Sequence, residues 1–138
     1  MKTVNASEAR AGDELPALEI PITATLIIGG AIASRDYQDV HHDRDLARER
    51  GAKDIFMNIL TTNGLVGRFV TDWAGPGALL TKVAIRLGAP NYPGDAMRLT
   101  GRVTRVQDGT VDLEVRGINS IGEHVSGTVT LMLPAGSR

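Results

Sequence analysis

A single long stretch of helical periodicity near the middle of the chain places the strongest limit on its fold. Over residues 54–73 apolar side chains recur at steps of three and four, the spacing that gathers them on one face of a helix. We expect one helix there, capped by Asp54, uninterrupted by Asn63-Gly64 and ended by Gly75-Pro76-Gly77. A chain with one such helix needs one concave apolar surface to cover it.

The residues after this helix change to a period of two, which predicts strands that bury one face. Asp108-Gly109 lies between two of these strands and is a hairpin signal. A strongly curved antiparallel sheet would supply the concave surface that the helix needs. We therefore predict an α+β domain with the hot-dog fold, one long central helix wrapped by a curved antiparallel β-sheet, as a single domain over residues 1–138. The predicted strands cover residues 79–87, 97–106, 111–116 and 125–133.

The residues before the helix give weaker signals. Residues 1–14 are polar and are expected to form a flexible lead-in. A strand is expected to begin around Pro21, which confines it to the edge of a sheet. Residues 23–33 are predicted to form a strand that leads into a loop, and Asp43 is expected to cap a short helix through Arg50.

The amino-acid composition limits the kinds of molecule that the chain is expected to bind. The 138 residues include 15 Lys and Arg against 16 Asp and Glu, so the net charge is −1 and no nucleic-acid partner is expected. There is no cysteine, which removes disulfides and thiol nucleophiles. The apolar stretch of residues 26–33 is far shorter than the roughly 20 residues that span a bilayer, and the N-terminus lacks the apolar core of a signal peptide. We expect a cytoplasmic protein with no membrane contact.

The polar loop of residues 34–43 holds the strongest candidates for chemistry. Asp36 and His41 are five residues apart, a step that lets a loop turn back and aim both side chains into one cleft. An imidazole can move a proton near neutral pH, and a carboxylate can orient it or share a water with it. The alternative is an ordinary polar loop, because Asp and His also cap helices and face water. A metal site is not expected, because the neighbours His41, His42 and Asp43 would not converge on one ion.

Two other features have plainer interpretations. His124 lies in or beside a hairpin and is expected to be a solvated turn residue. Arg68 and Asp72 are four residues apart on the predicted helix and are expected to form a surface ion pair.

The loop around Asp36 and His41 resembles that of the MaoC-like (R)-specific enoyl-CoA hydratases. The family loop is Ser-Gly-Asp-x-Asn-Pro-x-His, and Ser34, Asp36 and His41 match it at the family spacing. Arg35, Gln38 and Asp39 stand where the family has Gly, Asn and Pro. The resemblance extends further to the small MaoC-like subunit of the actinobacterial steroid (cholesterol) side-chain hydratases. The stretches that carry it are residues 35–45, 53–56, 58–61 and 71–76.

This resemblance implies a reaction and a set of partners. It implies a hydro-lyase that adds water to a steroid trans-2-enoyl-CoA with a three-carbon side chain, during sterol side-chain degradation. Coenzyme A is then part of the substrate, and no separate cofactor is expected. The implied partner is a MaoC-like domain of a larger subunit, which pairs with the small subunit into a heterotetramer and can associate with an aldolase.

The resemblance also assigns roles to three residues. Asp36 and His41 would hold one water, with Asp36 as the principal base and His41 as water-positioner and proton donor, or with these roles reversed. Asn58 stands where the family has a glycine, and its backbone N–H would stabilise the thioester oxyanion. Two alternatives stay open: a hot-dog acyl-CoA thioesterase, and a non-catalytic stabilising subunit of a MaoC-like heteromer.

Overall fold

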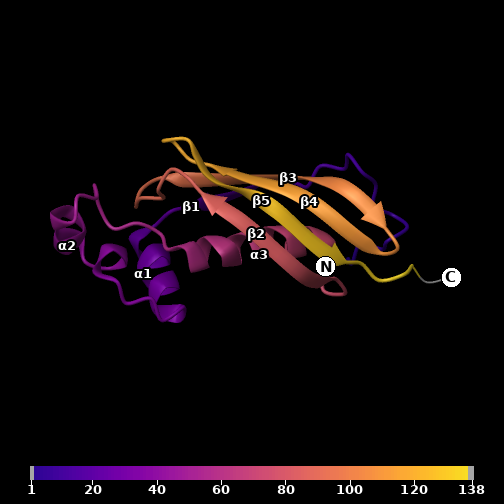
Figure 1. The fold of residues 1–138 in the computed structure, drawn as a ribbon, viewed down its shortest axis with the longest axis horizontal. Coiled ribbons are helices and arrows are strands. Elements are labelled where there is room, and N and C mark those ends of the chain that lie inside the picture. The colour runs from indigo at the N-terminus through magenta and orange to yellow at the C-terminus, as the bar shows by residue number, and fades with distance from the viewer. Residues whose placement is uncertain (1, 137–138) are drawn as a thin grey trace.

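A curved five-stranded antiparallel sheet packs against one long helix in the computed structural model, which describes residues 2–136 (Figure 1). The predicted α+β hot-dog arrangement is confirmed. Two short helices, α1 and α2, lie together beyond one end of the sheet (Figure 1). The elements are β1 (Leu18–Pro21), α1 (Ala24–Ala33), a 3₁₀ turn (Asp39–His41), α2 (Arg44–Glu49), α3 (Ile59–Ala74), β2 (Leu79–Leu87), β3 (Ala96–Gln107), β4 (Thr110–Ile118) and β5 (Glu123–Met132).

The strand order is β1-β3-β4-β5-β2, so β1 and β2 form the two edges of the sheet. β1 lies at an edge, as predicted, but it ends at Pro21, where it was expected to begin. At an edge the missing N–H of Pro21 costs no ladder hydrogen bond. β3 and β4 form the predicted hairpin, and Asp108 and Gly109 both have positive φ angles, of 51° and 80°. Positive φ at both central residues gives a turn whose twist matches that of the flanking strands.

The core lies between α3 and the concave face of the sheet. The buried stripe of α3 includes Val66, Phe69 and Val70, which match the predicted periodicity. Leu99 and Leu113 are among the fully buried strand residues that face it. Each such side chain contributes about 1.5–3 kcal/mol when it is removed from water. This burial fixes α3 against the sheet and so fixes both ends of the helix.

The start of α3 differs from the prediction. The helix begins at Ile59 and its N-cap is Asn58, whereas Asp54 was expected to be the cap. Residues 54–58 are extended instead, because the backbone N–H of Phe56 donates to Val40 O and that of Met57 donates to Asn91 O. The uninterrupted passage through Asn63-Gly64 and the end at Gly75 are confirmed. None of the helices within residues 2–136 is long and apolar enough to cross a bilayer.

The predicted strand over residues 23–33 is wrong, because this segment forms helix α1. Thr23 caps it by accepting the Leu26 N–H on its hydroxyl. Apolar side chains occupy most positions of α1, so the sequence lacks the apolar–polar contrast that reveals a helical period. α1 crosses α3 closely at Gly30, where a Cβ atom would overlap the Thr61 hydroxyl.

Residues 2–14, expected to be a flexible lead-in, lie against the domain. Backbone N–H groups of Val4 and Ala6 donate to Ala74 O and Pro134 O, at 2.9 and 3.0 Å. Ala9 is buried in the core cluster. The segment therefore runs along the far end of α3 and the sheet.

Candidate active site

The end of helix α1 places Asp36. The Asp36 N–H donates to Ala31 O at 2.9 Å, and the Arg35 N–H donates to Ile32 O at 3.0 Å. These paired bonds form the helix ending known as the Schellman motif, which needs a left-handed residue just after the C-cap. Arg35 is that residue, with φ of 56°, and it stands where the family loop has glycine. A rigid backbone motif thus presents the Asp36 carboxylate.

A 3₁₀ turn and the extended segment before α3 place His41. Its ring Nδ1 lies 2.7 Å from Phe56 O, and its ring meets the Phe56 ring edge-on at a centroid distance of 5.0 Å. A carbonyl only accepts, so Nδ1 carries the proton and Nε2 is left to face the site. Nε2 lies 3.4 Å from Asp36 Oδ2, and His41 is only 6% exposed. The structure therefore brings the predicted pair together.

The side chain of Asn58 links this pair to the start of α3. Its Nδ2 donates to Asp36 Oδ2 at 3.1 Å and to Ser34 Oγ at 3.0 Å. Its Oδ1 accepts the Thr61 N–H at 3.0 Å, which fixes the direction of the amide. Sequence reasoning gave Asn58 a role only through its backbone and missed the amide. A cap at Asn58 could have been expected, because Asn is among the residues preferred just before a helix, but its bond to Asp36 has no local signal.

These contacts hold Asp36 as a carboxylate. The hydrogen bond from Asn58 keeps the pKa of Asp36 below its usual range, the Gln38 N–H and His41 add to this lowering, and partial burial opposes it. At neutral pH the site therefore presents an anion, whose Oδ2 faces Nε2 of His41.

The backbone N–H of Asn58 indicates a second role for this residue. Asn58 N donates to no backbone or side-chain acceptor among residues 2–136. It stands at the N-terminal end of α3, where the helix dipole favours negative charge. This N–H lies in the residue whose amide holds Asp36, so an oxyanion bound there would sit beside the Asp36–His41 pair.

The other polar residues of the loop serve its structure. Asp43 caps α2 by accepting the N–H groups of Asp45 and Leu46, as predicted. Asp39 pairs with Arg50 at 2.7 Å. His42 is exposed and lies outside the group formed by Asp36, His41 and Asn58. The predicted surface ion pair between Arg68 and Asp72 is confirmed, with 3.4 Å between Nε and Oδ2.

The prediction for His124 is wrong. This residue is on β5 with 2% of its surface exposed, and both ring nitrogens have partners inside the protein. Its hairpin neighbourhood suggested a solvated turn, but the register of β4 and β5 shifts between the pairs Gly117–Val125 and Ile118–Glu123, so His124 lies at a bulge and is buried beside Val125.

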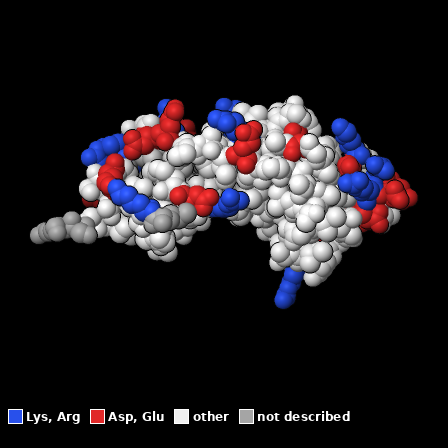
Figure 2. Space-filling view, turned by 180° about the vertical axis from the view of Figure 1, so that it is seen from behind, with Lys and Arg blue, Asp and Glu red and all other residues white. Residues whose placement is uncertain are grey.

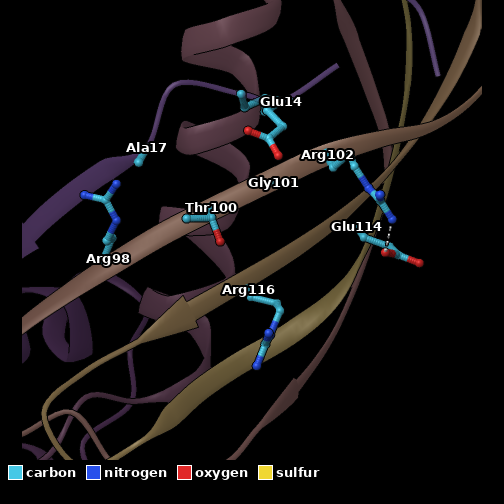
Figure 3. Close-up of a pocket in the computed structure, with 9 residues that line it drawn as sticks. Glu14, Ala17, Arg98, Thr100, Gly101, Arg102, Glu114 and Arg116 are labelled. Atoms are coloured by element: carbon cyan, nitrogen blue, oxygen red, sulfur yellow. Dashed lines mark ion pairs between the residues drawn. The ribbon is translucent and has the colours of Figure 1, made fainter. Parts of the chain in front are cut away.

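A hollow of about 550 Å³ lies on the outer face of β3 and β4 (Figure 3), and neither Asp36 nor His41 lines it. Arg98, Arg102 and Arg116 line it, but Glu14 and Glu114 line it as well. Each arginine also has a carboxylate within 4.0 Å, such as Glu114 for Arg102 at 3.8 Å. The positive charge is thus balanced locally, and this hollow lacks the groups for the chemistry described above.

Comparisons with known proteins identify relatives of the whole chain. No protein-family model matches the chain. The chain is 51% identical over 122 residues to the 3-oxo-4,17-pregnadiene-20-carboxyl-CoA hydratase beta subunit of Mycobacterium tuberculosis, a match that covers 88% of this chain and 95% of that protein.

Solved structures give the same result. A chain of the ChsH1–ChsH2 complex from M. tuberculosis is 50% identical, with a TM-score of 0.88 over 90% of this chain and 98% of that one. The R-hydratase PhaJ1 from Pseudomonas aeruginosa shares the fold at 20% identity, with a TM-score of 0.89 over 97% of this chain and 88% of that one. The chain therefore belongs to the MaoC-like enoyl-CoA hydratases, the family of this mycobacterial hydratase beta subunit.

Proposed function

We propose that this chain is the catalytic subunit of a hydratase that adds water to a steroid trans-2-enoyl-CoA with a three-carbon side chain. The observation that carries the proposal is the Asp36–His41 pair, whose facing atoms lie 3.4 Å apart. The hydrogen bond between His41 and Phe56 O and the one from Asn58 to Asp36 hold the two groups facing each other. A subunit that only stabilised its partner would have no use for that arrangement.

The pair is suited to holding one water. Asp36 is an anion and accepts, and Nε2 of His41 also accepts in the tautomer whose Nδ1–H donates to Phe56 O. A water between them donates one hydrogen to each, which leaves an oxygen lone pair free for the β-carbon of the enoyl thioester. General acid–base help of this kind is worth about 10²–10⁴-fold in rate.

The contacts of the pair favour His41 as the group that takes the proton. The lowered pKa makes Asp36 a weaker base than an ordinary carboxylate, and an imidazole is ordinarily the stronger base of the two. As the water oxygen bonds to the β-carbon, one water proton passes to Nε2, and Asp36 stabilises the imidazolium. That proton then goes to the α-carbon, so the pair returns to its starting state and no proton is gained or lost.

The thioester oxygen gains negative charge as the water attacks. In our proposal the backbone N–H of Asn58 binds that oxyanion at the start of α3. Addition of water transfers no electrons, so the reaction requires no redox cofactor, and coenzyme A enters as part of the substrate.

The name of the mycobacterial relative supports the steroid substrate. It describes a steroid thioester with a carboxyl-CoA on carbon 20 and a double bond at carbon 17. On such a substrate the water oxygen would bond to the ring carbon and the hydrogen to the side-chain carbon. The product is a tertiary alcohol, which has no carbinol hydrogen for a dehydrogenase to remove. Retro-aldol cleavage can consume it, which supports an associated aldolase.

The exposed apolar residues support a partner subunit. β2 is an edge strand, and its Leu79 and Leu80 are 61% and 36% exposed. Ile59 and Leu60 at the start of α3 are also exposed, close to Asn58 in the chain. A broad stretch of one face carries no Lys, Arg, Asp or Glu (Figure 2). We propose that a MaoC-like domain of a larger subunit covers β2 and this end of α3, and that two such pairs form a heterotetramer.

A comparison of substrates tests this function. The chain, assembled with its larger subunit, would be given the steroid enoyl-CoA or a short straight-chain trans-2-enoyl-CoA, with loss of enoyl absorbance and release of free thiol both recorded. We expect fast loss of absorbance on the steroid without thiol release. Thiol release from either substrate would favour the thioesterase instead, and hydration of the short substrate alone would remove the steroid assignment.

A further inference from the structure

His124 is a buried titratable residue that the proposed chemistry does not use. Its Nδ1 lies 2.6 Å from Ala89 O, and its Nε2 lies 2.8 Å from Thr62 Oγ1. Ala89 is in the loop between β2 and β3, and Thr62 is in the first turns of α3. The ring thus bridges that loop and the end of α3 that carries Asn58.

The contacts fix the direction of both hydrogen bonds. Because the Ala89 carbonyl only accepts, Nδ1 of His124 carries the proton. Burial lowers the pKa of His124, so the ring is neutral and Nε2 accepts. The Thr62 hydroxyl must therefore donate its single proton to Nε2.

This donation takes the Thr62 hydroxyl away from its own helix. Thr62 Oγ1 lies 3.5 Å from Asn58 O, the carbonyl four residues earlier. A threonine inside a helix commonly donates to that carbonyl, and this back-bonding bends the helix. Here Asn58 O accepts the Thr62 backbone N–H at 3.3 Å while the hydroxyl turns to His124.

The loop between β2 and β3 also binds Met57, the residue just before Asn58 in the chain. Asn91 O accepts the Met57 N–H at 3.1 Å, and Asn91 is itself fully buried and bonded to Asn119. The chain is therefore bound to this loop on both sides of Asn58. Met57, the preceding residue, is hydrogen-bonded to the loop directly, and Thr62, four residues later, is connected to it through His124.

We propose that His124 is a positioning residue for the hydration, which by accepting the Thr62 proton ties the first turn of α3 to the loop between β2 and β3 and so keeps the Asn58 amide on Asp36. This inference rests on the proposed function. His124 touches no reacting atom and acts only through Thr62 and Asn58.

Isosteric changes at Thr62 test this positioning in the assembled enzyme. Thr62→Val removes the hydroxyl and keeps the shape, and we expect kcat to fall about tenfold with KM within twofold, because small displacements of a catalytic group are costly. The pKa of the Asp36 carboxyl should rise, because Asp36 loses its best-placed donor. Thr62→Ser should restore both values.

Thr104→Val is the matched control. It also removes one hydrogen-bonded threonine hydroxyl, which here donates to Asp112 O on the outer face of β3, and it should change neither value. A folded Thr62→Val enzyme with the wild-type kcat and the wild-type Asp36 pKa would overturn the proposal.

Two NMR measurements need no substrate and so separate this inference from the proposed function. The nitrogen shifts of His124 should show a protonated Nδ1 and an accepting Nε2 in the wild-type chain. The carboxyl carbon of Asp36 should titrate at higher pH in Thr62→Val than in wild type, whichever thioester is the substrate. A proton on Nε2, or an unchanged Asp36 titration in the folded variant, would contradict the positioning role.

Discussion

At the scale of single residues, Arg35 carries strain that helps to define the site. Its left-handed backbone, with φ of 56°, costs about 1–2 kcal/mol for a residue with a Cβ. We expect Arg35→Gly to raise the free energy of unfolding by about 1 kcal/mol, measured by urea denaturation. Arg35→Ala, which removes the same guanidinium but keeps the strain, is the control. Equal stability of the two variants would contradict this interpretation.

Asn58 combines a helix cap with a hydrogen bond to Asp36, and two substitutions separate these roles. Asn58→Ser keeps an oxygen for the Thr61 N–H but lacks an amide to reach Asp36, whereas Asn58→Ala loses both. We expect the pKa of Asp36 to rise in both variants, measured from the pH dependence of its carboxyl carbon shift by NMR. Only Asn58→Ala should also lose about 1 kcal/mol of capping energy.

The lowered pKa of Asp36 determines how its contribution to the stability of the fold changes with pH. Asp36 contributes stability above the pKa of an unfolded Asp, about 3.9, and this contribution is lost as pH falls through its lower folded value. Acid unfolding should therefore show a smaller contribution from Asp36 in Asn58→Ser than in wild type. An unchanged Asp36 titration in Asn58→Ser would show that the amide is not the cause of the lowering.

At the scale of elements, the crossing of α1 and α3 sets the distance between Asp36 and Asn58. Gly30→Ala would push a Cβ into the Thr61 side chain, and we expect a loss of about 1–3 kcal/mol together with lower activity. Gly29→Ala, on the same helix with open space around it, should be neutral or stabilising by up to about 1 kcal/mol. Thermal unfolding of both variants measures this. Equal stability would show that the crossing tolerates a methyl group.

The sequence predicted those elements whose patterns contrast apolar and polar positions. The edge position of the strand at Pro21 and the hairpin at Asp108-Gly109 were predicted from local signals. The passage of α3 through Gly64 was predicted against the local Asn-Gly turn signal, because the apolar stripe continues on both sides of it. α1 has no such contrast, and its cap at Thr23 was overlooked. Asp54 and Asn58 are both good caps, and only the pairing of Phe56 and Met57 with distant carbonyls decides between them.

The candidate site was predictable in its members but not in its geometry. Asp36 and His41 were identified from their residue types and from the family spacing, and the structure places them together. The Asn58 amide and the His124–Thr62 contact each join residues distant in the sequence, so no local pattern could predict them.

At the scale of the whole molecule, the uncovered edge predicts how the chain assembles. We expect Leu80→Glu to weaken binding to the larger subunit at least about tenfold, because a carboxylate would be buried without a partner there. Ile121→Glu is the control, because Ile121 is an exposed apolar residue in the turn between β4 and β5. Titration calorimetry of both variants compares them. Equal binding would place the partner elsewhere.

The central claim is that this chain supplies the catalytic groups of the assembled hydratase. The most direct test measures hydration of the steroid enoyl-CoA by Asp36→Asn and by His41→Ala, each assembled with the wild-type larger subunit and shown by circular dichroism to be folded. Loss of either group should lower kcat by at least about 10²-fold, because each removes acid–base help. Wild-type turnover in both folded variants would contradict the account and would assign the chemistry to the partner.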